Sequence, residues 1–168
     1  MRYKIVLGLA AFLAVLDQLT KLVVTSKVLP YEMIRVTSFF NLVNVRNRGA
    51  AFGFLNDPAI AWQFWLFLAA TLVAVIIILC IVRGAGARDW PLFIGLGCIL
   101  GGAAGNLVDR VRLREVIDFL DFHYAGWHWP AFNVADMAIC AGAALTVLCM
   151  LRPNCTTDTS APHKEKET

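Results

Sequence analysis

Charged residues are scarce in this chain of 168 amino acids. Asp, Glu, Lys and Arg make up 16% of it and 59% of its residues are hydrophobic, whereas a soluble globular domain carries about 25% charged residues. Four long apolar stretches cover about half of the chain and hold only three charged side chains, Asp17, Lys21 and Asp136. Each stretch is close to the ~20 residues that a helix needs to cross a bilayer. This segregation excludes a water-soluble enzyme and a disordered chain.

Cysteine and net positive charge are also low, and this excludes two further classes. The five Cys residues show no paired spacing, so a disulfide scaffold is not expected. The net charge of +3 is too small and too dispersed for a nucleic-acid-binding protein. A His-Glu-x-x-His zinc motif is absent from the sequence. A metal site remains an alternative, built from Asp118, Asp121, His123 and His128.

The four apolar stretches are predicted to be transmembrane helices. Backbone polar groups in lipid must bond within their own segment, which favours helices, and Trp residues near the expected ends suit the headgroup level. We expect an all-α polytopic membrane protein whose residues 1–151 form one four-helix domain. The predicted spans are residues 5–24, 60–82, 90–108 and 131–151.

Two segments outside the spans have their own character. Residues 28–58 contain runs of β-branched and aromatic residues, at 34–36 and 39–45, which favour a small strand-bearing subdomain outside the cytoplasm. Residues 152–168 are rich in Pro, Thr, Ser, Lys and Glu, a composition typical of a disordered tail.

The orientation in the membrane is weakly encoded. Arg and Lys residues divide evenly between the two sides, so the first span decides, and Arg2 and Lys4 before it favour cytoplasmic N- and C-termini. Residues 1–18 could instead be a cleaved secretory signal, but no small-residue cleavage site follows and Asp17 ends the apolar run.

The polar residues of the spans gather at one side of the membrane. Ionisable groups inside a membrane are expensive and usually functional. With the N-terminus inside, these residues lie at the outer ends of the first, third and fourth spans or in the connection between the last two, and they stay together if the topology is inverted. They are Asp17, Lys21, Asn106, Asp109, Arg110, Asp118, Asp121, Asn133 and Asp136. The sequence therefore predicts one polar site at one membrane–water boundary.

Helix spacing suggests structural roles for several of these residues. Asp17 and Lys21 are four residues apart with the acid first, which favours an ion pair, and we expect the Lys21 ammonium to reach toward the interface. In the third span Gly97, Gly101 and Gly105 form a bare stripe that another helix can approach closely.

The residues that follow this stripe have two interpretations. Asn106, Asp109 and Arg110 could mark an interfacial helix end with an Asp–Arg pair, or they could take part in chemistry. Because structural ion pairs outnumber catalytic ones, spacing alone favours the first.

Asp118 and Asp136 could act as a pair. Asp118 stands among Ile, Phe and Leu, so its pKa should be raised, whereas the dipole of an apolar helix stabilises the ionised form of Asp136 in its first turn. If they meet, a single proton stays between them near neutral pH, an arrangement suited to acid–base peptide hydrolysis. A capping box with Asn133 explains Asp136 equally well, and composition does not choose between Asp118 and Asp121.

These residues resemble those of the lipoprotein signal peptidases, the signal peptidase II family of bacterial membrane aspartic peptidases. The resemblance extends from about Ile5 to Leu151. Five motifs in order carry it: Asp17-Gln18-Leu19-Thr20-Lys21, Asn47-Arg48-Gly49-Ala50-Ala51-Phe52-Gly53, the run from Gly101 to Arg110, Val116-Ile117-Asp118-Phe119, and Phe132-Asn133-Val134-Ala135-Asp136.

The resemblance implies a specific activity. The enzyme would lie in the bacterial cytoplasmic (inner) membrane and cut diacylglyceryl-modified prolipoproteins just before the lipidated Cys, with Asp118 and Asp136 catalytic and Asp121 a bystander. Membrane lipid and prolipoproteins would be its partners and globomycin-type antibiotics its inhibitors, with no metal, organic cofactor or nucleic acid. The residues implied to support the site or bind substrate are Asp17, Lys21, Asn47, Gly49, Gly105, Asn106, Asp109, Arg110, Asn133 and Ala135.

Two other functions compete with this one. A small proton-coupled transporter or channel component could use buried Asp and Lys as a relay, but it predicts polar groups in the inner half of the bundle, which carries no charge in the sequence. A chelator-sensitive metallopeptidase is the third possibility.

Overall fold

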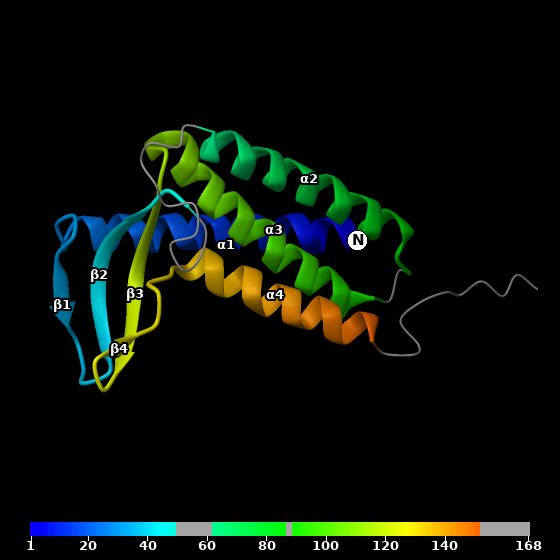
Figure 1. Cartoon of the computed structure of the whole chain (residues 1–168). Coiled ribbons are helices and arrows are strands. Elements are labelled where there is room, and N and C mark those ends of the chain that lie inside the picture. Colours follow the sequence, from blue (N-terminus) through cyan, green and yellow to red (C-terminus); the bar gives the residue numbers. More distant parts are fainter. Residues whose placement is uncertain (50–61, 87–88, 152–168) are drawn as a thin grey trace, which may run out of the picture.

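The computed structural model describes residues 1–49, 62–86 and 89–151, in which four helices extend from a small β-sheet at one end of the molecule (Figure 1). The predicted tail at 152–168 and the part of the predicted subdomain after residue 49 lie outside the described residues. The elements in order are α1 (Arg2–Thr25), β1 (Met33–Arg35), β2 (Phe40–Asn47), α2 (Gln63–Gly84), α3 (Trp90–Leu113), β3 (Val116–Tyr124), β4 (Trp127–His128) and α4 (Val134–Met150).

Three of the four helices are long and apolar enough to cross a membrane, namely α1, α2 and α3. The apolar helix α4 has 17 residues, which at 1.5 Å per residue is about 25 Å, slightly short of the ~30 Å hydrocarbon core. Several boundaries differ from the predicted spans, and two of these differences lie next to the polar residues. Because Asn133 is an extended N-cap, α4 begins at Val134 and not at 131. The helix α3 continues past 108 to Leu113, where Arg114 ends it in the left-handed conformation.

The glycines of α3 allow this helix to pack closely against both α1 and α4. A Cβ atom at Gly101 would lie 2.9 Å from the carbonyl oxygen of Ala10 in α1, and Gly97 faces α1 in the same way. On the neighbouring row, a Cβ at Gly102 would collide with the carbonyl oxygen of Ala135 in α4. The predicted stripe of small residues is therefore confirmed as a packing surface, and α3 is the central helix of the polar site.

The sheet has the strand order β1-β2-β3-β4 with antiparallel pairing throughout. Its first two strands fall where β-branched and aromatic residues predicted them. The sheet also contains two strands from outside the predicted subdomain, 28–58, because β3 and β4 come from the connection between α3 and α4. Pairing of β2 with β3 sets Val45 opposite Asp118 and Asn47 opposite Val116.

A small apolar cluster joins the sheet to the helices. Val24 and Val28, at the end of α1 and just beyond it, pack with Phe119 of β3. Three partly buried residues complete the cluster: Leu42, Leu120 and Val134. This contact holds β3 beside the end of α1 and the start of α4.

Candidate active site

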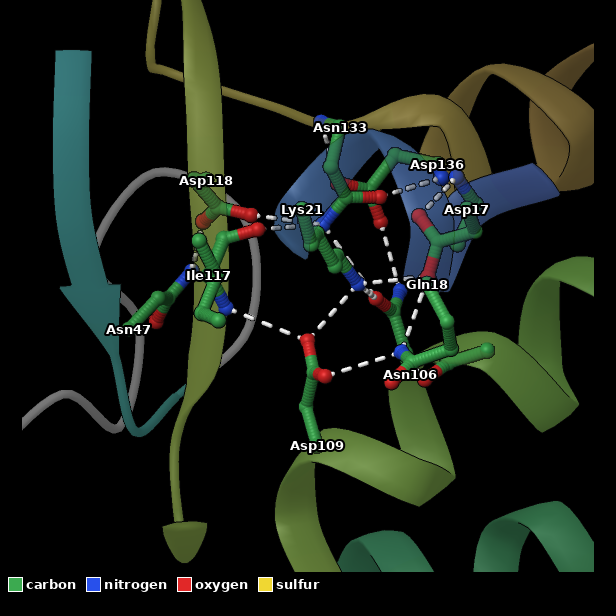
Figure 2. A network of polar contacts seen from close by, with 12 residues as sticks. Asp17, Gln18, Lys21, Asn47, Asn106, Asp109, Ile117, Asp118, Asn133 and Asp136 are labelled. Carbon is green, nitrogen blue, oxygen red and sulfur yellow. Dashed lines mark hydrogen bonds and ion pairs between the residues drawn. The ribbon is translucent and has the colours of Figure 1, made fainter. Parts of the chain in front are cut away.

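Asp118 of β3 and Asp136 of α4 are joined by one residue, Asn133 (Figure 2). The Asn133 Nδ2 atom donates a hydrogen bond to Asp118 Oδ1 at 2.7 Å, and the Asn133 backbone N–H donates to Asp136 Oδ2 at 3.1 Å. Asp118 is 3% exposed, whereas Asp136 is half-buried. The structure thus brings together two carboxyl groups from different elements.

Asn133 also caps α4. Its Oδ1 atom accepts a hydrogen bond of 2.9 Å from the Asp136 backbone N–H, and with the reciprocal bond this completes a capping box. The capping prediction is confirmed. Because the Nδ2 atom of the same side chain contacts Asp118, capping and a place in the site are compatible roles.

The environment of Asp118 stabilises its protonated form. Burial, with a further contribution from the charge of Asp136, raises the pKa of Asp118 to about 7. Hydrogen bonds from Asn47 and Asn133 act in the opposite direction but do not cancel this rise. The Asn47 bond joins its Nδ2 to Asp118 Oδ2 at 3.0 Å. Near neutral pH, Asp118 can therefore hold a proton beside the Asp136 carboxyl group.

Asp121, the alternative to Asp118, has other partners. It accepts a hydrogen bond of 2.8 Å from Asn41 Nδ2 and lies 2.9 Å from His128 Nδ1. Burial by itself would raise the pKa of Asp121, but the bonds from Asn41 and His128 outweigh it and hold the pKa below its ordinary value. Two of the residues proposed for a metal site are therefore separated, since Asp118 bonds Asn133 whereas Asp121 contacts His128. The part of the chain that the structure describes has no group of three or more potential ligands arranged for a metal ion.

Lys21 lies in a buried ion-pair cluster next to the two carboxyl groups. Its Nζ atom is 2.7 Å from Asp17 Oδ2 and 2.7 Å from Asp109 Oδ2, and the residue is 2% exposed. The ion pair with Asp17 is confirmed. The prediction that Lys21 reaches toward the interface is wrong, because two carboxylates compensate its charge inside the protein. The prediction that Asp109 pairs with Arg110 is also wrong, since Lys21 is the cation that Asp109 contacts.

Asn106 connects this cluster to the carboxyl pair. Its Oδ1 atom accepts hydrogen bonds from Lys21 Nζ at 3.1 Å and from Asn133 Nδ2 at 3.2 Å. Its Nδ2 atom donates to Asp136 Oδ1 at 2.8 Å. A continuous chain of polar contacts therefore runs from Lys21 to Asp136, as Figure 2 shows.

Gly105 and Ala135 set the position of Asp17. A Cβ at Gly105 would lie 2.6 Å from Asp17 Oδ2, so only glycine leaves room for the carboxylate. The backbone N–H of Ala135 donates to Asp17 Oδ1 at 2.9 Å. Asp17 is held in this way between α3 and the first turn of α4.

Arg110 and Gly49 join the cluster through Asn47. The Arg110 Nη2 atom donates to the carbonyl oxygen of Gly49 at 3.3 Å, and its guanidinium carbon lies 4.3 Å from the centre of the Phe67 ring in α2. The Gly49 backbone N–H donates to Asn47 Oδ1 at 2.9 Å. The residues predicted for the site thus form one connected cluster, while positions 50–53 of the outer-loop motif lie outside the described residues.

Gln18 is a member of the cluster that the predicted site left out. Its Nε2 atom donates to Asp109 Oδ1 at 2.9 Å and to the Gly105 carbonyl oxygen at 3.1 Å. The sequence signal was its place between Asp17 and Lys21 in the first motif, but an uncharged amide within a helix does not by itself indicate a contact with another helix.

Comparisons with known proteins agree on one family. The family described as Signal peptidase (SPase) II matches residues 9–152. A lipoprotein signal peptidase of Nitratidesulfovibrio vulgaris (strain DP4) is 54% identical over 153 residues, which cover 90% of this chain and 92% of that protein. One from Janthinobacterium sp. (strain Marseille) is 51% identical over 148 residues, 87% of each protein.

Two solved structures, each described as a bacterial membrane enzyme, have a similar fold. The first has a TM-score of 0.74 at 26% identity and covers 97% of this chain and 94% of its own. The second has a TM-score of 0.76 at 27% identity, and the match covers 88% of this chain and 93% of the chain in that structure.

Proposed function

Because this chain belongs to the signal peptidase II family of bacterial membrane enzymes, we propose that it cleaves lipid-modified prolipoproteins with two aspartates, Asp118 and Asp136. Membership in the family supports a lipoprotein signal peptidase activity on prolipoprotein substrates. The observation that carries the catalytic assignment is that Asn133 donates one hydrogen bond to each of the two carboxyl groups, and so holds them on either side of a single residue.

The two carboxyl groups divide the work of hydrolysis. Asp136 is ionised and takes a proton from a water molecule as the water oxygen adds to the scissile carbonyl carbon. Asp118 is protonated, polarises the carbonyl oxygen, and gives its proton to the leaving amine when the C–N bond breaks. The products are a carboxylic acid and an amine, and transfer of the proton from Asp136 to Asp118 restores the starting state.

The depth of the site fits a substrate held in the bilayer. The sheet lies at one end of the helices, together with the start of α4, and the N-terminus lies toward the other end (Figure 1). Asp118 in β3 and Asp136 in the first turn of α4 are thus at the sheet end. At the other end, Arg2 Nη1 donates to the Ala85 carbonyl oxygen at 2.8 Å. We assign α4 as a fourth span, both termini to the cytoplasm, and the site to the outer boundary of the inner membrane. Two acyl chains would then hold the bond before the lipidated Cys at headgroup level.

Specificity should come from the shape around the lipidated Cys. Burial of acyl chains is worth ~0.8 kcal/mol per CH2, but membrane lipid offers much the same burial, so the chains alone discriminate little. An uncleaved peptide of the globomycin type would inhibit by occupying the space in front of Asp118 and Asp136.

The distribution of buried polar side chains is unfavourable for a transporter. A proton relay would need such groups along the depth of the bundle. Among the described residues, those that are buried and polar lie at the sheet end, apart from Thr146 in α4. This supports a reaction at one boundary.

Asp118→Asn and Asp136→Asn test the assignment. Each should lower kcat/KM by roughly 10²- to 10⁴-fold, the usual contribution of general acid–base catalysis. The assay is cleavage of a peptide with a diacylglyceryl cysteine, fluorescent on one side of the scissile bond and quenched on the other.

Asp121→Asn is the matched control, since it changes a buried carboxyl group of the same strand outside the pair, and it should retain activity within about tenfold. Near-normal cleavage by folded Asp118→Asn or Asp136→Asn protein would refute the assignment. Activity in EDTA should equal activity without it, and loss in EDTA would favour the metallopeptidase.

A further inference from the structure

Three asparagine side chains direct their NH2 groups at the carboxyl pair. Asn47 and Asn133 donate to the two oxygens of Asp118, and Asn106 donates to Asp136 Oδ1. The two ends of a carboxamide differ, because the nitrogen only donates and the oxygen only accepts. What binds the oxygen of each amide therefore decides whether its NH2 group faces the carboxyl.

The three amide oxygens have different donors. The oxygens of Asn47 and Asn133 accept backbone N–H bonds, both at 2.9 Å, from Gly49 and Asp136. The oxygen of Asn106 instead accepts from the Lys21 ammonium at 3.1 Å, together with Asn133 Nδ2 at 3.2 Å. The amide oxygen of Asn106 thus accepts a hydrogen bond from a charged side chain.

We propose that Lys21 is a positioning residue for the reaction: by binding the Asn106 oxygen it turns the NH2 group of Asn106 to Asp136, so that Asp136 is the ionised partner and Asp118 carries the proton. This inference rests on the proposed function. It adds that Lys21, acting through Asn106, determines which of the two aspartates starts the reaction with the proton.

The neighbours of Lys21 keep it in this place. Asp17 and Asp109 each lie 2.7 Å from its Nζ atom, and the Gln18 amide holds the other oxygen of Asp109 at 2.9 Å. An ammonium group can only donate hydrogen bonds. The Asn106 oxygen therefore faces a donor as long as these ion pairs hold Lys21 in place.

The charge balance of the site agrees with one retained proton. If all the carboxyl groups were ionised, four negative charges would face two positive ones, and a proton on Asp118 reduces this excess. Burial raises the pKa of Asp118 to about 7, in the same direction. Among the residues that the structure describes, the titratable groups facing the pair are Asp17 and Lys21 from α1, Asp109 and Arg110 from α3, Asp118 from β3 and Asp136 from α4.

The test is the dependence of kcat/KM on pH for Lys21→Met and Asn106→Leu in the lipopeptide assay. Asn106→Leu removes the hydrogen bond from Asn106 Nδ2 to Asp136, and Lys21→Met removes the donor that turns Asn106 toward Asp136. In both variants the acidic limb of the profile should move up by about one pH unit or more. Lys27→Met changes an exposed lysine just beyond α1 and should leave the limb in place.

The double variant separates positioning from a direct effect of charge. If Lys21 acts through Asn106, Lys21→Met/Asn106→Leu has the limb of Asn106→Leu alone. Added shifts would mean that Lys21 acts through space, and lower activity at all pH values with an unmoved limb would mean a structural role. Either result overturns the inference.

If Lys21→Met does not fold, the Asn106→Leu variant tests the inference by itself, because it keeps the ion pairs of Lys21 with Asp17 and Asp109. An unmoved acidic limb in folded Asn106→Leu protein rejects the inference. If Asp118→Asn and Asp136→Asn are inactive in the same assay, only the role of Lys21 fails, whereas activity in those variants rejects the proposed function itself.

Discussion

Asp118 is flanked along β3 by the buried residues Ile117 and Phe119, whereas Asp136 is half-buried in the first turn of α4. Two carboxyl groups with the same intrinsic acidity are thereby placed in different surroundings, which is how a protein divides acid and base roles between identical side chains. The difference arises from the elements that carry them, a buried strand for one and a helix N-terminus for the other.

The pH dependence of cleavage should report the proton on Asp118. Burial raises the pKa of Asp118 to about 7, so the proton is present below that pH and is lost above it. If hydrolysis needs this proton, kcat/KM should fall about tenfold per pH unit on an alkaline limb beginning near pH 7. Steady-state cleavage in a series of buffers measures it, with Asp121→Asn as a control that keeps the limb. A rate unchanged up to about pH 9 would contradict the role of Asp118.

The cluster around Lys21 also shows what single residues contribute to stability. Removing one partner of a buried ion pair leaves an uncompensated charge and typically destabilises a protein by roughly 3–5 kcal/mol. Sequence spacing predicted the bond between Asp17 and Lys21, which lie on one helix. It could not predict Asp109 as the second partner, because that contact depends on how closely α1 and α3 approach.

The helix α3 carries most of the close contacts of the bundle. Its glycines bring the backbones of α1 and α4 near enough for Asn106 to reach Lys21 of α1 and Asp136 of α4, and for Asp109 to reach Lys21. At Gly101 and Gly102 the close approach involves main-chain atoms, so no rotation of a side chain can make room for a larger residue there.

Gly101→Ala should destabilise the protein by roughly 1–3 kcal/mol, the usual effect of overpacking. Its Cβ would lie 2.9 Å from the carbonyl oxygen of Ala10. Gly8→Ala in α1 is the matched control, since a Cβ there meets nothing within 4 Å and alanine is the better helix former. Thermal unfolding in detergent should show a lower Tm for Gly101→Ala and an unchanged or higher one for Gly8→Ala. Equal Tm values would refute close packing at this position.

The strand β3 illustrates a limit of prediction at the level of elements. Its residues, Val116–Tyr124, are rich in β-branched and aromatic types, yet the segment was predicted only as a connection between two spans. Strand formation depends on a partner that offers the right edge. Here the partner is β2, about seventy residues earlier in the chain, so only the folded chain makes Val116–Tyr124 a strand.

For the molecule as a whole, the sheet lies at the end of the bundle where α4 begins (Figure 1). The polar cluster lies at the same end, between α1, α3, β3 and the start of α4 (Figure 2). This follows from the alternating direction of the helices, which returns the end of α1, the start of α2, the end of α3 and the start of α4 to the same side. A reaction at that end is confined to one face of the membrane.

Labelling of single cysteines should establish which face this is. In a variant without the five native Cys residues, Thr37→Cys lies on the sheet side and Gly84→Cys at the opposite end of α2. With the site outside, a membrane-impermeant maleimide should label Thr37→Cys in intact cells, and Gly84→Cys only after permeabilisation. The reverse pattern would invert the proposed topology.

The sequence by itself determined that helices of membrane-spanning length form, because apolar runs near 20 residues with so little charge have few other stable states. It also determined that the polar residues of the spans lie at the same membrane boundary. Successive spans run in opposite directions, so the positions of these residues along the chain bring them to one side in either orientation. Only the tertiary structure decided that Asn133 bonds both Asp118 and Asp136 while Asp121 has other partners, that Lys21 stays buried between Asp17 and Asp109, and that β3 completes the sheet. These outcomes depend on contacts between segments far apart in the chain, and local composition carries no information about distance across the fold.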